Sequence, residues 1–278
     1  MRVTKKLTAA LAAGTLAAAL SACSGGEPAA QAEATDASVA EAGAEPAENL
    51  EELTTIIEAA QKTATSAHME MTYGGEAAET AGMTGSTTTA DFSIGESKKP
   101  ADMTMQMSMS MMDMEFDMRM VDGIMYMNMG ELSQGKFIEM PLEELKKEPG
   151  LASTLESMES WDVAAQADEM KDAVTSFEHT GSETVDGVDV EVYTMTVDPA
   201  KLKDGAAGVD AEMAKQVGEM TVVYKIDPEG LPLEADIAMD VQGKEMTMDT
   251  SFSKWGEPVT VEAPPKNEVV PYSEIKGG

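Results

Sequence analysis

The stretch ADMTMQMSMSMMDMEFDMRM, residues 101–120, places a methionine or Phe116 at nearly every second position, and the alternation changes phase at Met111 and Met112. A period of two is typical of a β-strand with one apolar face. One strand of this length would extend about 70 Å, whereas a single domain of this size has a radius of gyration of about 17 Å. The chain must therefore turn back near Ser110 to Asp113, so the stretch is predicted to be a β-hairpin.

A two-residue turn at Met111 and Met112 predicts the pairing within this hairpin and puts all of its methionines on one face. The predicted opposite pairs are Ser110 with Asp113, Met109 with Met114, Met107 with Phe116, and Met105 with Met118. The same apolar pattern continues on the next strand and recurs near the C-terminus. The residues that continue it are Met125, Met127, Met129, Ile237, Met239, Met246 and Met248.

The rest of the chain predicts one helix and then a series of hairpins. Asn49 as N-cap, with Glu52 three residues later, begins an amphipathic helix over 49–67. The strands are expected at 68–73, 86–94, 102–110, 113–121, 124–129, 136–140, 176–184, 188–197, 219–227, 233–241 and 245–254. Further helical stretches start at Pro141 and Pro199, and the second ends at Gly218. This pattern favours the α+β class, with about eleven mostly antiparallel strands.

The N-terminus has the features of an export signal. Basic residues in MRVTKK precede an Ala- and Leu-rich stretch over 7–20 that is too short for a membrane-spanning helix. It ends in Leu20, Ser21, Ala22 and Cys23, which resembles the lipobox of bacterial lipoproteins. The resemblance implies that residues 1–22 are a signal peptide and that Cys23, the sole cysteine, carries a diacylglycerol or further acyl group. We expect this covalent anchor to hold the protein on the membrane, and no other cofactor.

Residues 23–48 are expected to be the acylated cysteine and a disordered acidic tether. Residues 24–48 contain six acids, no base and no aromatic side chain. One folded domain then spans 49–272, followed by a short tail over 273–278. The formal net charge of the whole chain is −32, which disfavours nucleic acid and anionic headgroups as partners. We therefore expect the acyl anchor, rather than electrostatic attraction, to hold the protein at the membrane. We also expect a monomer.

The chain resembles the actinobacterial LppX, LprA, LprF and LprG lipoproteins, which share the LolA-like fold. The resemblance rests on Cys23, on a helix before the first strand, on MVDGIMYMNMG at 120–130, and on FSKWGEPVTVEAPP at 252–265. It implies a strongly curved antiparallel half-barrel with helices packed on its concave face and acyl chains held between them. It therefore implies a carrier of lipid or glycolipid on the extracytoplasmic face of the cell membrane, with an export or acceptor protein that the sequence does not identify.

The methionine-rich face has three interpretations. It is a plain core in which methionine replaces Leu and Val, as in a surface lipoprotein without a ligand. Alternatively it lines a lipid cavity, because methionine is unbranched and polarizable and adapts to different acyl chains. Copper(I) is the third interpretation, since thioethers are soft ligands and His68 lies beside methionines in HMEM. The predicted cavity residues are Met105, Met107, Met109, Met114, Phe116, Met118, Met125, Met127, Met129, Ile237, Met239, Met246 and Met248.

Enzymatic function has little support in the sequence. The chain has two histidines and no thiol besides Cys23, and it lacks a Gly-rich phosphate loop and a GxSxG elbow. Its 51 acids are too many for a pair of carboxylates to indicate glycoside hydrolysis. We also find no calcium-loop motif and expect no metal site of that kind. The sequence therefore favours a binding protein over an enzyme.

Overall fold

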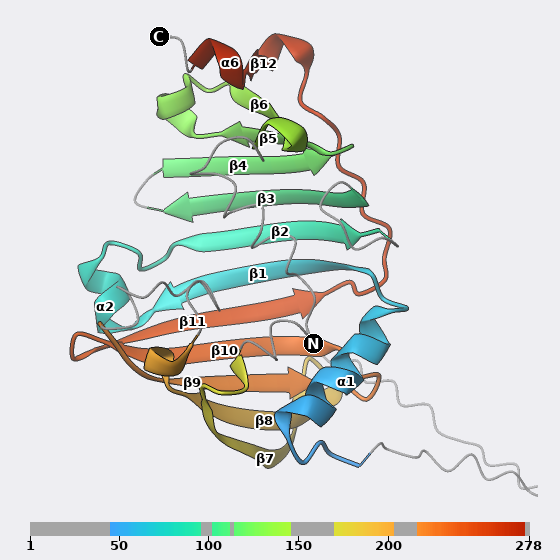
Figure 1. The fold of residues 1–278 in the computed structure, drawn as a ribbon, viewed down its shortest axis with the longest axis vertical. Coiled ribbons are helices and arrows are strands. Elements are labelled where there is room, and N and C mark those ends of the chain that lie inside the picture. The colour runs from blue at the N-terminus through green and yellow to red at the C-terminus, as the bar shows by residue number, and fades with distance from the viewer. Residues whose placement is uncertain (1–44, 96–101, 112–113, 146–169, 203–215, 276–278) are drawn as a thin grey trace, which may run out of the picture. The chain divides into compact units, whose positions relative to one another are not determined.

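Residues 43–278 form one compact unit in a computed structural model, which describes residues 45–95, 102–111, 114–145, 170–202 and 216–275. Within these ranges twelve strands form a single open, curved sheet, in the order β12-β6-β5-β4-β3-β2-β1-β11-β10-β9-β8-β7 (Figure 1). The predicted α+β class with a half-barrel sheet is confirmed. No helix among these residues is long and apolar enough to cross a membrane.

The strands are β1 (Ser66–Gly74), β2 (Thr87–Ile94), β3 (Met103–Met111), β4 (Met114–Val121), β5 (Ile124–Asn128), β6 (Phe137–Pro141), β7 (Val174–Val185), β8 (Val188–Val197), β9 (Val217–Ile226), β10 (Pro232–Val241), β11 (Lys244–Ser253) and β12 (Val269–Pro271). The helices are α1 (Leu50–Gln61), α2 (Gly75–Thr80), α3 (Leu142–Leu145) and α6 (Tyr272–Ile275), with 3-10 turns η2 (Gly130–Ser133), η3 (Pro199–Lys201) and η5 (Lys266–Glu268).

Two meanders of antiparallel strands make up the sheet, and they meet between β1 and β11. We call β1–β6 the first half and β7–β11 the second half. Hairpins with Asp-Gly turns occur in both, and the turn residues Asp122, Gly123, Asp186 and Gly187 all have positive φ, as the VDG motifs predict. Within each half every strand pairs with its neighbour along the chain, and the pairing of β1 with β11 joins the two halves.

The methionine hairpin forms as predicted, but its register differs. Met111 pairs directly with Met114, so the two-residue loop comprises residues 112 and 113, which lie outside the described residues. Met109 faces Phe116 and Met107 faces Met118, two residues away from the predicted partners. A shift of two residues leaves every side chain on the same face, so alternation alone cannot distinguish the two registers. The predicted turn position is wrong, and the predicted shared face is right.

Paired residues share a face, so the register defines two faces of the sheet. The apolar face carries the row Ala67, Phe92, Met105, Met120, Met125 and Met140, one residue from each of six strands. The opposite, polar face carries the adjacent row His68, Asp91, Gln106, Arg119, Tyr126 and Glu139. The core lies on the apolar face, in one cluster centred on β1–β6 and two smaller clusters over β7–β10.

Helix α1 covers part of the apolar face in the second half. Its predicted cap is confirmed, because the Asn49 side chain accepts a hydrogen bond from the Glu52 backbone N–H at 3.0 Å. Its buried Leu53 and Ile57 pack with Tyr193 and Ile226. Ala47, which the sequence places in the tether, is 2% exposed, and its N–H donates to the Tyr193 hydroxyl at 3.1 Å.

Several local features differ from the sequence expectations. Gly218 lies inside β9 and does not end a helix. Pro141 is the last residue of β6, and the helix predicted to start there begins one residue later as α3. The segments around 146–169 and 203–215, where further helices are predicted, lie outside the described residues. Helix α2 and the short strand β12 were not predicted, and β12 pairs in parallel with β6.

The segment after β11 runs along the strand ends of the first half. We call residues 254–265 the strap. Near its start, the ring of Trp255 contacts Phe92 and Phe252, and Trp255 Nε1 donates to the Pro232 carbonyl at 2.9 Å. The strap is held to β1 by Ser66, which donates to the Glu257 carbonyl at 2.7 Å. It continues past β4 to β12 at the far edge (Figure 1).

Candidate functional site

All thirteen predicted cavity residues lie at strand positions of the apolar face or directly after a strand, and their burial differs in a regular way. Across β3–β5 they form successive rows. The first row holds Met105, Met120 and Met125, the second Met107, Met118 and Met127, the third Met109 and Phe116, and the fourth Met111 and Met114. Adjacent rows are about 7 Å apart, because side chains on one face of a strand recur every two residues. The sequence predicted the face, and the rows follow from the register.

The first row is fully buried. Met105 is 1% exposed and Met120 is 0% exposed, and the row packs against Leu142 and Leu145 of α3 and the partly buried Trp255. We call this the closed end of the apolar face. Met105 and Met125, both predicted to line a cavity, lie in the hydrophobic core here.

The methionines and Phe116 of the following rows are more accessible than the first row. Met107, Met118 and Met127 are partly buried and pack against the edge of the core, as does Met129. Met109, Met111 and Phe116 are also half-buried, and Met114 is 39% exposed. The apolar face therefore changes over four rows from dry core to solvent-exposed methionine.

The four predicted residues of the second half continue this face across the junction. Ile237 pairs with Met248, Met239 pairs with Met246, and all four are half-buried. Ile237 and Met239 pack against the cluster of Met195, Met220 and Val222, and Tyr73 of β1 is opposite Met248. The structure thus places all the predicted residues on one continuous surface.

One hydroxyl on this surface has no hydrogen-bond partner among the described residues. Thr88 of β2 is 4% exposed, its Oγ1 is buried, and it is paired with Met109 in the third row. Burial of an unsatisfied hydroxyl costs about 1–3 kcal/mol, so its position among methionines calls for a physical reason. The sequence analysis missed this residue, although its even position in β2 put it on the apolar face.

His68 does not join the methionines. Its Nδ1 lies 2.8 Å from Asp91 Oδ1 on the polar face, opposite the face that carries Met69 and Met105. No cluster of three or more His, Cys, Asp or Glu that could hold a metal occurs among the described residues. A copper site made of His68 and the strand methionines is therefore not formed.

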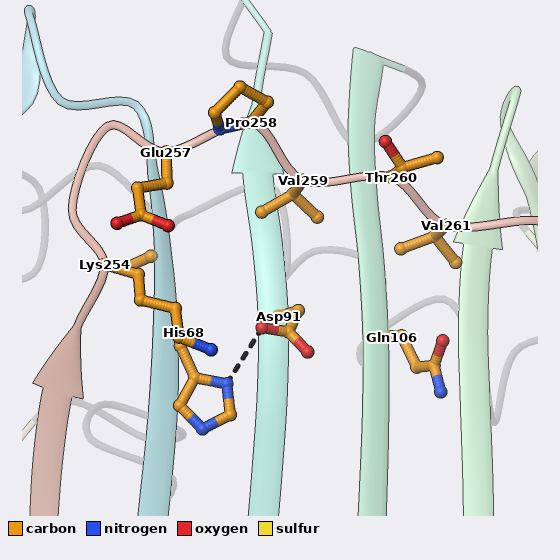
Figure 2. A pocket seen from close by; sticks show the side chains of 10 residues that line it. His68, Asp91, Gln106, Lys254, Glu257, Pro258, Val259, Thr260 and Val261 are labelled. Atoms are coloured by element: carbon orange, nitrogen blue, oxygen red, sulfur yellow. Dashed lines mark hydrogen bonds and ion pairs between the residues drawn. The ribbon is translucent and has the colours of Figure 1, made fainter.

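The polar face carries shallow hollows that the sequence analysis did not predict. Figure 2 shows one of about 240 Å³, in which the strap residues Glu257 to Val261 pass over His68, Asp91 and Gln106. A second, of about 430 Å³, is lined by Ser and Thr hydroxyls of β2 and β3 and by Glu115 and Asp117. The lining of the first hollow is mostly polar, whereas the second also includes Met109 and Phe116.

The charges of the polar face are only partly compensated. Lys225 forms ion pairs with Glu183 and Glu234, and hydrogen bonds to these carboxylates raise its pKa. Asp236 lies nearby, and burial raises the pKa of its carboxyl, with Glu234 and Asp249 adding to the rise and Lys225 opposing it. These charged groups make this part of the face suited to contact with water.

The predicted lipidation site lies outside the described residues, as do Leu20, Ser21 and Ala22 of the lipobox. Anchoring through Cys23 therefore stays a prediction from the sequence.

No protein-family model matches the chain, and no curated protein matches it. Solved structures do. LprF from Mycobacterium bovis has a TM-score of 0.50 with 15% identity, and the match covers 79% of this chain and 98% of LprF. Lipoprotein LppX from Mycobacterium tuberculosis has a TM-score of 0.45 with 18% identity, over 77% of this chain and 98% of LppX. A LolA superfamily protein from Nitrosomonas europaea has a TM-score of 0.24 with 12% identity, over 74% and 94%. The fold implied by the sequence resemblance is confirmed as the fold that this chain shares with LprF.

Proposed function

We propose that the protein binds the acyl chains of a lipid or glycolipid on the methionine rows of its apolar face and carries them outside the cytoplasmic membrane, anchored through acylated Cys23. The observation that carries this proposal is the graded burial of one residue type on one face. Met105 and Met120 are buried, whereas Met107, Met109 and Met118 are only partly covered. A plain core gives no reason for a broad band of partly exposed methionine.

The chemistry of methionine supports a lipid ligand. Each methylene of an acyl chain that leaves water contributes about 0.8 kcal/mol, so contact with several rows would provide useful affinity. Methionine has three rotatable bonds and a polarizable sulfur, so the rows can adapt to chains of different length and unsaturation at little strain. The fold shared with LprF and the resemblance of the sequence to a lipoprotein family are consistent with this function.

Two variants of adjacent residues test the proposal. The mature chain with Cys23→Ala removes the covalent acyl group, so any lipid found by native mass spectrometry is bound noncovalently. Met107→Asp places a carboxylate on the apolar face, whereas Ser108→Asp places the same group on the polar face of the same strand. We expect Met107→Asp to lose lipid and to keep most of its thermal stability, and Ser108→Asp to keep both.

Absence of extractable lipid from the parent chain would overturn the proposal in favour of a surface lipoprotein without ligand. A large loss of melting temperature in Met107→Asp, with normal lipid in the protein that stays folded, would make the second row core and place the ligand elsewhere.

The anchor has its own test. Cys23→Ala in the full-length chain is expected to abolish partition into the membrane fraction. Retention of that variant on membranes after a high-salt wash would mean that another segment holds the protein there.

A further inference from the structure

An exposed apolar rim lies where the methionine rows end. Met114 begins β4 and is 39% exposed, and Leu132 in η2 is 72% exposed. The two belong to the same end of the sheet, since a Cβ added to Gly130 of η2 would lie 3.3 Å from the Glu115 carbonyl oxygen. In Figure 1 these strand ends lie on the left side of the sheet, where β4 starts. We call Met114 and Leu132 the rim.

The turn that presents Leu132 is built by polar contacts that do not involve the leucine side chain. Asn128 Oδ1 accepts from the Gly130 N–H at 2.9 Å and from the Ser133 hydroxyl at 3.0 Å, and Asn128 Nδ2 donates to the Gly135 carbonyl at 3.1 Å. The turn would therefore form with a polar residue at position 132. The exposed leucine is therefore not required by the turn that presents it.

Helices or the strap cover other parts of the sheet near its strand ends, whereas Met114 and Leu132 are exposed. On the same side of the sheet, α2 packs on β11 and β1 (Figure 1). Lys244 holds it there by donating to the Thr80 hydroxyl at 2.7 Å. At the opposite strand ends, α3 and Trp255 pack against the first row. Among the described residues of β3–β5, the apolar face is thus accessible from the rim and buried at the closed end.

We propose that the rim touches an uncharged or zwitterionic lipid leaflet and that an acyl lipid passes over it tail first, so that the tail lies toward the closed end and the polar end stays at the rim. This proposal rests on the proposed function and adds a direction to it. Glu115 and Glu131 flank the two rim side chains and would repel anionic headgroups. Two apolar side chains make only a weak contact, which suits a carrier that must leave the leaflet again.

Thr88 supplies an independent sign of the same orientation. Its hydroxyl, which has no hydrogen-bond partner in the part of the chain that the structure describes, lies in the third row, one row from Met114 and two rows from Met105. An ester carbonyl next to a headgroup at the rim would reach this row and accept a hydrogen bond from the Thr88 hydroxyl. A lipid bound in the reverse direction would place only methylenes there and leave the hydroxyl unsatisfied.

Transfer kinetics test the rim. The mature chain with Cys23→Ala is mixed with phosphatidylcholine vesicles that hold a fluorescent phosphatidylcholine, and uptake is followed by relief of self-quenching. Leu132→Asp is expected to slow uptake at least fivefold, with unchanged melting temperature and unchanged lipid per protein at equilibrium. The control is Val188→Asp, since Val188 is 38% exposed in the second half of the sheet, and it should change nothing.

The preference for ester-linked over ether-linked lipid tests the proposed orientation of the bound lipid. Thr88→Val keeps the side-chain shape and removes the hydroxyl, so it should reduce the preference for diacyl over dialkyl-ether phosphatidylcholine by about fivefold. Thr89→Val, the next residue on the polar face, should leave that preference unchanged.

Each outcome decides between the proposals. If the parent chain takes up no lipid, the proposed function fails, and this inference fails with it. If the parent chain takes up lipid but the rim variant is as fast, or Val188→Asp is as slow, the rim is not the route. An unchanged ester preference in Thr88→Val would overturn the tail-first orientation while leaving lipid binding itself intact.

Discussion

The two halves of the sheet build their cores from different side chains. In β1–β6 the buried cluster contains five methionines, Met103, Met105, Met120, Met125 and Met140, with half-buried methionines at its margin. In β7–β10 the clusters are built mainly from β-branched and aromatic residues such as Val197, Val222 and Tyr193, and α1 covers part of them. Stiff side chains specify one packing, whereas methionine tolerates several. The difference indicates that the second half is a scaffold and the first half an adaptable surface.

The largest expected effects test whether both halves have a true core. Met105→Ala in the first half and Met195→Ala in the second each remove a side chain that is 1% exposed, which should cost roughly 2–5 kcal/mol of unfolding free energy. Urea unfolding measures both. A loss below about 1 kcal/mol for Met105→Ala alone would mean that the adaptable region extends to the closed end.

Changes of shape should separate the halves more sharply. Val222→Leu adds a methylene to the packed second half and should cost about 1–3 kcal/mol, whereas Met107→Leu should cost less than about 1.5 kcal/mol. Thermal unfolding of the two variants gives the comparison. Equal losses would contradict the view that the first half adapts and the second does not.

Removal of the helix cap should affect the second half alone. Asn49→Ala loses the bond to the Glu52 N–H and should cost about 1 kcal/mol. Hydrogen exchange is expected to speed up in α1 and in the strands beneath it, β8 and β9, with no change in β3–β5. Thr55→Ala, an exposed change in the same helix, is the control, and faster exchange across the first half would show that the halves are coupled.

The smallest expected effect is electrostatic and confined to the polar face of the second half. Burial raises the folded-state pKa of Asp236 above that of the unfolded chain, so ionisation of this carboxyl destabilises the fold once the pH exceeds the unfolded value. Asp236→Asn should therefore raise stability slightly at pH 7, and this gain should vanish as the pH falls through the ordinary range of an aspartate. Melting curves at pH 7 and pH 3 measure it, and a loss at pH 7 would make the ion-pair contribution of Lys225 dominant.

Local sequence patterns were sufficient for most of the sheet. Alternation and Asp-Gly turns located eleven strands, and Asn49 with Glu52 located the first helix, because these signals depend on residues close together in the chain. The strand β12 has three residues, and its partner β6 lies some 130 residues earlier, so no local signal could reveal it. Gly218 was mistaken for a helix end because glycine is common at both helix ends and strand positions close to a neighbouring backbone.

For the candidate site, the sequence predicted which face of the sheet carries the residues but not how far each side chain is buried. Alternation tells which side of a strand a methionine occupies, and all the predicted residues do share one side. Whether a methionine is buried depends on what packs over it, such as α3 and Trp255 over Met105. The rim residue Leu132 and the buried hydroxyl of Thr88 were missed because each becomes notable only through its three-dimensional neighbours.

The junction between β1 and β11 has a consequence for the order of folding. Each half is a meander of neighbouring strands that can form from local hairpins, but the junction pairs Met71 with Thr250, roughly 180 residues away in the chain. Closing so long a loop costs entropy that the junction contacts recover only once both strands are in place. We therefore expect the halves to gain structure first and the junction to form late, so that substitutions at Met71 or Thr250 speed unfolding and leave the refolding rate nearly unchanged in stopped-flow experiments. A nascent chain would then hold a nearly complete methionine half while it waits for its last long strand.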